Sequence, residues 1–475
     1  MTQADPDQRQ AAEPAHTPDT APADPRHAHT PRDVVPLRQA VRTWFAISLQ
    51  TFGGPAGQIA VMQRALVEEK RWIGQQRFNH ALSYCMLLPG PEAQQLAVYI
   101  GWLLNGTRGG LVAGTLFVLP GVLALLALSA IYVGWGTAAV VTGLFAGLAP
   151  AVLAIVAQAV IRVGRRSLTH PALIALAVTA FAALAAFAVP FPVVIAAAAA
   201  AGWLLARLRP HAFTTGTRHG DGGPEPLISD DTLHHEPPGL RRGAKVLAAG
   251  LLLWGVPLAA VAALTGTGSV FTDQGLFFSG TALVTFGGAY AVLSYVAQQA
   301  VTTYGWLNPG EMVRGLALAE TTPGPLIMVV QFVAFVGAYR APGDLDPWAA
   351  ALLGALLTTW VTFVPCFIFI FLGAPYVERL RGNAAISAAL TGITAAVVGV
   401  IANLAVYFAT HTLFRDTRTT DRGPVHLLVP DPATWRPTAL AITLAALAMI
   451  FLLRWSVLRT LGACAALGLA ATLIW

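Results

Sequence analysis

The chain has 475 residues, of which 56% are hydrophobic and only 11% are charged. Soluble domains contain roughly 25% charged residues, and a soluble protein of this length could not bury so much apolar surface. The composition therefore predicts an all-α polytopic membrane protein, and it excludes a soluble enzyme, a disulfide scaffold and, with a net charge of only +6 and no basic face, a nucleic-acid-binding protein.

The chain begins with a polar segment and continues as two apolar parts separated by a polar linker. Residues 1–36 are rich in Pro, Ala, Asp and His and predict a disordered tail, without a signal peptide, so that internal helices direct insertion. We assign a first transporter half to 37–206, a cytoplasmic linker to 207–242 and a second half to 243–475. Continuous apolar runs predict nine membrane-spanning helices, at 111–133, 137–161, 170–189, 190–206, 243–265, 347–373, 384–411, 437–453 and 456–474.

Two further regions, 40–106 and 275–339, are apolar but interrupted by Gly, Pro and polar residues, and they repeat one another. Thr51-Phe52-Gly53-Gly54 recurs as Thr285-Phe286-Gly287-Gly288, and Pro89-Gly90-Pro91 recurs as Pro323-Gly324-Pro325, both at an offset of 234 residues. From residue 44 to residue 91, 11 of 48 positions are identical without a gap, whereas chance predicts about 10% of them in so biased a composition. The identities fall on helix-breaking residues, which indicates a tandem duplication with broken or re-entrant helices in each half.

The distribution of basic residues predicts that the second half is inverted relative to the first. Five predicted spans separate the two interrupted regions, and an odd number reverses the second copy. With a cytoplasmic N-terminus, almost all Lys and Arg of the short loops fall inside, and mainly Arg340 and the loop 413–436 fall outside. The tail and the linker are then cytoplasmic.

The helix breaks predict a site for a small anion. Backbone that leaves helical geometry inside a membrane is tolerated where it lines a protein cavity, and such breaks form the substrate sites of secondary transporters. The residues from Glu92 to Gln94, and from Leu326 to Met328, would present free N–H groups at the positive end of a helix dipole. Thr51 and Thr285 would add hydroxyl groups. The alternative is that Pro-Gly-Pro is a kink and Thr-Phe-Gly-Gly a packing seam.

Ionisable residues at membrane depth are candidates for function. Arg314 could face the anion, and Glu92, Glu320 or Glu311 could carry a proton. Alternatively, Glu311 and Arg314 form a structural pair at i, i+3 spacing. The histidines lie mostly in the tail and linker, and Cys85, Cys366 and Cys464 are scattered, so we expect neither a metal site nor another cofactor.

At these motifs the sequence resembles the chromate ion transporter (CHR) family in its long, two-domain form. The matching stretches are Thr51-Phe52-Gly53-Gly54-Pro55, Leu88 to Ala97, Tyr99 to Trp102, Gly109-Gly110, Leu119-Pro120-Gly121, Thr285-Phe286-Gly287-Gly288 and Ala319-Glu320-Thr321-Thr322-Pro323-Gly324-Pro325-Leu326. The second copy departs from the first at Ala289-Tyr290, which replaces Pro55-Ala56, and at Leu326, which replaces Glu92. The two halves of the site are therefore not equivalent.

The resemblance implies a bacterial inner-membrane exporter of chromate that confers chromate resistance, without catalytic residues. The resemblance also implies that the quoted positions, including Gln94 and Thr322, are the motif residues of the family. Two rival functions stay open: transport of sulfate or another tetrahedral oxyanion, and a membrane enzyme acting on lipid phosphates, for which Glu68-Glu69 is the only candidate cluster. The expected partners are the dianion and the lipid bilayer. The oligomeric state is not determined, and a homodimer is one alternative.

Overall fold

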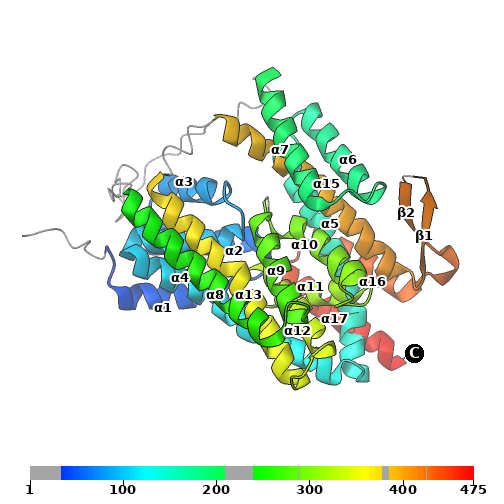
Figure 1. Cartoon of the computed structure of the whole chain (residues 1–475). Coiled ribbons are helices and arrows are strands. Elements are labelled where there is room, and N and C mark those ends of the chain that lie inside the picture. Colours follow the sequence, from blue (N-terminus) through cyan, green and yellow to red (C-terminus); the bar gives the residue numbers. More distant parts are fainter. Residues whose placement is uncertain (1–33, 209–238, 287, 377–383, 424, 475) are drawn as a thin grey trace, which may run out of the picture. The chain divides into compact units, whose positions relative to one another are not determined.

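A computed structural model describes residues 34–208, 239–286, 288–376, 384–423 and 425–474 of the chain. The predicted tail over 1–36 and linker over 207–242 lie almost entirely outside these residues, as does Gly287 of the second Thr-Phe-Gly-Gly motif. The described part is an all-α polytopic membrane protein (Figure 1), because its helices are long and apolar and its two strands form only one short hairpin.

The first half begins with short elements and ends with long helices. Its elements are α1 (Leu37–Ser48), α2 (Gly54–Gln63), the π-helical turn η1 (Arg64–Glu69), α3 (Gln75–Cys85), α4 (Glu92–Trp135), α5 (Ala139–Ser167), α6 (Pro171–Ala185) and α7 (Phe191–Leu208). The two predicted breaks fall between α1 and α2 and between α3 and α4. A third break, not predicted, lies inside α4, where Asn105 and Gly106 have non-helical dihedral angles.

Helix α8 (Leu240–Thr265) opens the second half, and the elements after it repeat the order of the first half. Its elements are α9 (Val270–Leu283), α10 (Ala289–Gln298), the π-helical turn η3 (Gln299–Thr303), α11 (Glu311–Thr321), the 3₁₀ turn η4 (Leu326–Met328), α12 (Val329–Arg340), α13 (Pro347–Gly373), the 3₁₀ turn η5 (Ala374–Tyr376), α15 (Ala384–Leu413), β1 (Thr417–Arg422), β2 (Val425–Pro430), the 3₁₀ turn η6 (Pro432–Thr434), α16 (Pro437–Phe451) and α17 (Val457–Ile474).

Local geometry recurs together with the sequence. Left-handed dihedral angles occur at Gly54 and Gly288 and at Gly90 and Gly324, each pair 234 residues apart. Only glycine adopts these angles without a steric penalty. Each half also has a π-helical turn at the corresponding place. The duplicated sequence therefore specifies duplicated breaks.

The expectation of nine full spans stays a prediction. All nine apolar runs are helical, but α6 and α16 have only 15 residues each, whereas a perpendicular crossing needs about 20. Among the described residues, seven helices are long and apolar enough to span a membrane: α4, α5, α7, α8, α13, α15 and α17. The boundaries of the linker also shift, because α7 extends to Leu208 and α8 starts at Leu240.

Helices of each half pack against helices of the other half. Helix α5 of the first half packs against α16 and α17 of the second, and α15 of the second half packs against α6 and α7 of the first. Glycines allow both contacts, because a Cβ at Gly147 would lie 1.8 Å from the carbonyl oxygen of Cys464, and one at Gly392 would lie 2.4 Å from that of Ala198. Reciprocal contacts of this kind are the mark of an approximate two-fold relation. The inversion of the halves across the membrane stays a prediction.

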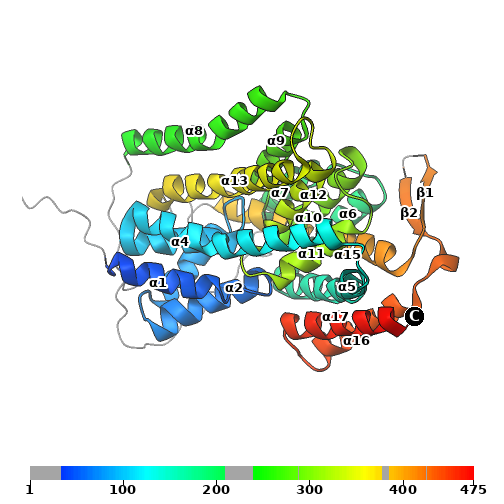
Figure 2. The same ribbon diagram turned by 90° about the horizontal axis from the view of Figure 1, so that it is seen from below.

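Helix α8 and the β1–β2 hairpin have no counterpart in the other half. Helix α8 runs along the edge of the molecule beside α13 (Figure 2), and its apolar surface is largely uncovered by protein. The antiparallel strands β1 and β2 join α15 to α16, and they lie at the end of the described structure opposite α1 and α3. We call this end the hairpin face.

Candidate functional site

The four predicted breaks meet in pairs across the two halves. The N–H of Gly90 donates to the carbonyl oxygen of Thr285 over 2.7 Å, and the N–H of Gly324 donates to the carbonyl oxygen of Thr51 over 3.0 Å. Each Pro-Gly-Pro motif thus binds the Thr-Phe-Gly-Gly motif of the opposite half. Sequence analysis predicted that these motifs converge, but it did not predict that the glycine N–H groups hold the halves together. We call these four segments the paired breaks.

The threonine hydroxyls are used inside the protein. Thr51 donates its hydroxyl to the carbonyl oxygen of Ser48, and Thr285 donates to that of Thr281. Thr322 likewise donates to the carbonyl oxygen of Ala319. These bonds satisfy carbonyl groups left open at helix ends. The expectation that Thr51 and Thr285 offer hydroxyl hydrogens to an anion is therefore not met in this conformation.

The two Pro-Gly-Pro motifs start different helices. Pro91 occupies the cap position of α4, and no side chain caps this helix. The first-turn N–H groups, from Glu92 to Gln94, therefore have no partner within the helix. After Pro325 the chain forms a 3₁₀ turn, in which the N–H of Met328 donates to the carbonyl oxygen of Pro325. Of the three N–H groups predicted to be free in the second copy, that of Met328 is therefore used within the turn.

Buried amide side chains of the first half gather at the paired breaks. Gln58 donates to the carbonyl oxygen of Gly324 over 2.6 Å, and Gln95 donates to that of Pro89 over 2.7 Å. Gln94 is fully buried, and neither of its polar atoms has a partner within the part of the chain that the structure describes. The side-chain amide oxygens of Gln58 and Gln95 also have no hydrogen-bond partner among the described residues. Buried polar atoms without partners are costly, so these amides are suited to bind a polar guest.

The second half contributes a carboxylate instead. The hydroxyl of Tyr290 donates to Glu320 Oε1 in a short hydrogen bond, while Glu320 Oε2 has no described partner. Glu320 is 1% exposed. A Cβ at Gly54 would lie 3.8 Å from the Tyr290 hydroxyl, so this pair adjoins the first Thr-Phe-Gly-Gly motif. Sequence analysis identified Glu320 but not Tyr290 as a site residue, although Tyr290 marks a departure between the copies.

Other predicted residues lie around these groups. Glu92 is half-buried in the first turn of α4, where a helix dipole also favours a carboxylate for purely structural reasons. Phe52 and Phe286 are half-buried beside the glycines. Cys366, which was not predicted, lies close to Gly90, because a Cβ there would be 2.8 Å from its sulfur. The Gly90 turn is therefore tightly enclosed.

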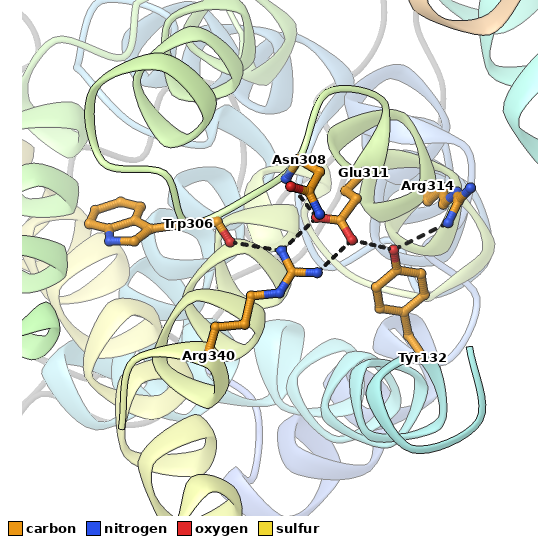
Figure 3. Close-up of polar contacts among 6 residues, drawn as sticks. All are labelled: Tyr132, Trp306, Asn308, Glu311, Arg314 and Arg340. Carbon is orange, nitrogen blue, oxygen red and sulfur yellow. Dashed lines mark hydrogen bonds and ion pairs between the residues drawn. The ribbon is translucent and has the colours of Figure 1, made fainter. Parts of the chain in front are cut away.

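Glu311 belongs to a separate polar cluster (Figure 3). Its carboxylate accepts two hydrogen bonds from Arg340, at 2.7 and 2.8 Å, one from the Tyr132 hydroxyl at 2.8 Å, and one from the N–H of Asn308 at 2.7 Å. The expected pairing of Glu311 with Arg314 is wrong, because Arg340 provides the bidentate geometry that a carboxylate prefers. Arg314 instead donates to the Tyr132 hydroxyl over 3.4 Å.

No group of three or more His, Cys, Asp or Glu side chains that could hold a metal ion occurs among the described residues. The polar groups of the paired breaks are backbone amides, glutamine amides, one tyrosine and one or two carboxylates. Such a set favours an anion, which N–H donors can surround, over a metal cation. A carboxylate beside the donors gives a place to bind a proton.

Comparison with known proteins agrees with the duplication. The family model described as "Chromate transporter" matches residues 38–203 and 272–469, two segments whose starts are 234 residues apart. A "Chromate transport protein" of Pseudomonas aeruginosa is 33% identical over 375 residues, which are 76% of this chain and 79% of the relative. A "Chromate transport protein" of Cupriavidus metallidurans is 28% identical over 79% of this chain and 84% of its own length. A "Probable chromate transport protein" of Synechococcus elongatus is 26% identical over 88% and 96%. No solved structure matches the chain.

Proposed function

Because the chain belongs to the chromate transporter family, we propose that it exports chromate from the bacterial cytoplasm across the inner membrane, with the anion held at the paired breaks. The observation that carries this proposal is the reciprocal bonding of Gly90 to Thr285 and of Gly324 to Thr51. It joins four interrupted segments from two halves at one place, beside buried amides that have no described partner.

The paired breaks also suggest how the site opens and closes. Each glycine–threonine hydrogen bond joins one half to the other, and each is a single bond that contributes about 1 kcal/mol net. Rocking of one half against the other would break one bond while the other holds. The released glycine N–H would then become a donor for the anion. Alternating access around a fixed site is the usual mechanism of transporters built from repeats.

Energetics favour export of a dianion. Moving one charge through 100 mV is worth about 2.3 kcal/mol, so two charges supply about 4.6 kcal/mol in an inside-negative cell. This corresponds to a concentration ratio of roughly 2,000. Membrane potential alone is therefore sufficient, and a proton carried by Glu320, hydrogen-bonded to Tyr290, would add to it.

Chromate flux in proteoliposomes tests this proposal. Vesicles containing the full chain are loaded with labelled chromate, and a potassium diffusion potential or a pH gradient is imposed. We expect efflux to increase with an inside-negative potential and to be absent from vesicles without protein. Flux that ignores both gradients would overturn the mechanism. Competition by sulfate would measure selectivity, because amide donors distinguish poorly between tetrahedral dianions of equal charge.

A further inference from the structure

A cavity of about 380 Å³ opens on the hairpin face, away from the paired breaks. It lies between the N-terminal ends of α5, α11 and α16 and the C-terminal ends of α15 and α17. Since one water molecule occupies roughly 30 Å³ of liquid, the cavity has room for a tetrahedral anion with part of its hydration shell. Its lining includes Arg314, Arg436, His411, Thr142, Thr438 and Thr472.

The charged side chains that line this cavity are all positive. Within the described residues, Arg314 and Arg436 line this cavity and no Asp or Glu does. Burial, together with the nearby charges of Arg415 and Arg314, lowers the pKa of Arg436, which lies in the loop before α16. The carboxylate of Asp416 raises the pKa of Arg436, but this effect is the smallest of those acting on it. Two guanidinium groups held near each other repel, and a bound anion would remove that cost.

The carboxylate nearest to Arg314 in sequence is already committed. Glu311 accepts hydrogen bonds from two guanidinium nitrogens of Arg340, from the Tyr132 hydroxyl and from the Asn308 N–H (Figure 3). Arg314 reaches this cluster only through the Tyr132 hydroxyl, which accepts its hydrogen bond while donating to Glu311. The positive charge of Arg314 is therefore left for another anion.

Helix dipoles do not account for the positive charge around this cavity. Three helix N-termini and two C-termini reach it, and opposite ends of helices contribute partial charges of opposite sign. A smaller cavity of about 310 Å³, between α1 and η1, provides a contrast, because Glu69 lines it together with Arg42 and Lys70. The absence of a lining carboxylate thus distinguishes the cavity at the hairpin face.

We propose that this cavity is a second oxyanion site, a vestibule that a tetrahedral dianion occupies between the paired breaks and the water at the hairpin face. The proposal rests on the proposed function for its direction of passage, but the site itself requires only an accessible dianion. Arg314 and Arg436 supply the charge that holds the anion. In the predicted orientation the vestibule faces the outside and is the exit.

Binding and transport together test the vestibule. Labelled chromate and labelled sulfate are bound to the purified full chain at equilibrium, and Arg314→Gln, Arg436→Gln and the double variant are compared with wild type. We expect two sites in wild type, and loss of one of them in the double variant. Each single variant should weaken that site by roughly tenfold, because a hydrogen bond to a charged group is lost. Arg314→Lys, which keeps the charge, should weaken it less.

Arg418→Gln is the matched control. Arg418 lies in the hairpin of the same face and its side chain is 80% exposed, but it does not line the cavity. In proteoliposomes, the double variant should raise the apparent KM for chromate offered at the hairpin face, and leave the KM at the other face unchanged. Arg418→Gln should change neither value.

The outcomes separate this proposal from the proposed function. If wild type transports chromate but the double variant keeps both binding sites and both KM values, the vestibule is wrong and the transport function stands. If wild type binds dianions at two sites without transporting chromate, and the double variant loses one site, the vestibule stands and the transport function fails. A double variant that unfolds is replaced by the single variants, whose unchanged binding would overturn the vestibule.

Discussion

The two sets of helix breaks have the same backbone and different side chains. Gly90 and Gly324 both take left-handed dihedral angles, and both donate to a threonine carbonyl of the other half. The polar side chains, by contrast, are divided between the halves. Gln58, Gln94 and Gln95 of the first half correspond, at an offset of 234, to Val292, Met328 and Val329 of the second.

The second half likewise has polar side chains that the first half lacks. Tyr290 and Glu320 correspond to Ala56 and Met86 of the first half. One half thus provides neutral amide donors, and the other provides a carboxylate with its tyrosine partner. The comparison teaches that duplication fixed the backbone of the paired breaks, whereas divergence changed their side chains. Under the proposed function, the amides would form an anion side and Glu320 a proton side. Four experiments can break or sharpen this comparison.

The largest effect is expected at the shared backbone. Gly90→Leu should abolish chromate transport, because the left-handed conformation costs a side chain about 1–2 kcal/mol and a Cβ would lie 2.8 Å from Cys366 and Gln95. Gly324→Leu has the same conformational cost, but the atom nearest to its Cβ would be the Cα of Gly121, at 3.4 Å. We therefore expect residual transport from Gly324→Ala and none from Gly90→Ala, measured as initial efflux per inserted protein.

Gly343→Ala is the control for the glycine variants. Gly343 also has a positive φ angle, of 62°, but no atom lies within 4 Å of its added Cβ. Its transport should stay close to wild type. Normal transport by Gly90→Leu with normal insertion would remove the paired breaks from the mechanism.

The second effect concerns the proton side. Glu320→Gln keeps the shape of the side chain but cannot release a proton, so we expect chromate efflux to lose its response to a pH gradient and to keep its response to potential. Tyr290→Phe, which removes the hydrogen bond to Glu320, should weaken the response to pH without removing it. The measurement is efflux under each gradient separately. An unchanged response to pH in Glu320→Gln would exclude this carboxylate as the proton carrier.

The third effect concerns the anion side. Gln94→Met gives the first half the residue of the second, and it should weaken chromate binding by roughly tenfold, which is the value of one or two hydrogen bonds. Met328→Leu is the matched control and should leave the affinity unchanged. The apparent KM for chromate is measured at fixed potential. Equal affinities in the two variants would mean that Gln94 does not contact the anion.

The smallest effect is expected at Glu311, which is a structural residue in our interpretation. Glu311→Gln weakens the bidentate pair with Arg340, whose side chain is 40% exposed, so the loss should be about 1 kcal/mol after screening by water. We expect a melting temperature that is a few degrees lower and an unchanged response of transport to pH. Loss of that response would instead make Glu311 a proton carrier, as one of the sequence-based alternatives has it.

Much of the fold followed from local sequence. Apolar runs predicted every long helix, because a membrane helix must be apolar along its whole length. Glycine and proline predicted the breaks, because only these residues allow left-handed turns or remove a backbone donor. The lengths of α6 and α16 were overestimated at their C-terminal ends, because hydropathy alone does not show that the apolar chain leaves the helix after Ala185 or after Phe451.

The partners of the polar side chains were decided by tertiary structure. Glu311 lies three residues from Arg314 but binds Arg340, which is 29 residues away and comes close only when α11 and α12 pack together. Gln58 reaches Gly324 across 266 residues, and Arg314 and Arg436, which are far apart in the chain, line the same cavity. Spacing along one helix predicts neighbours on that helix, and it cannot predict contacts between distant segments.

The sequence by itself determined that this chain is a duplicated membrane protein with four glycine-dependent breaks, because hydropathy and backbone conformation are properties of single residues and short segments. Only the tertiary structure decided that each break bonds to the opposite half, that amides and carboxylate come from different halves, and that two arginines share one cavity. Those features depend on distances between segments far apart in the chain, which packing alone sets.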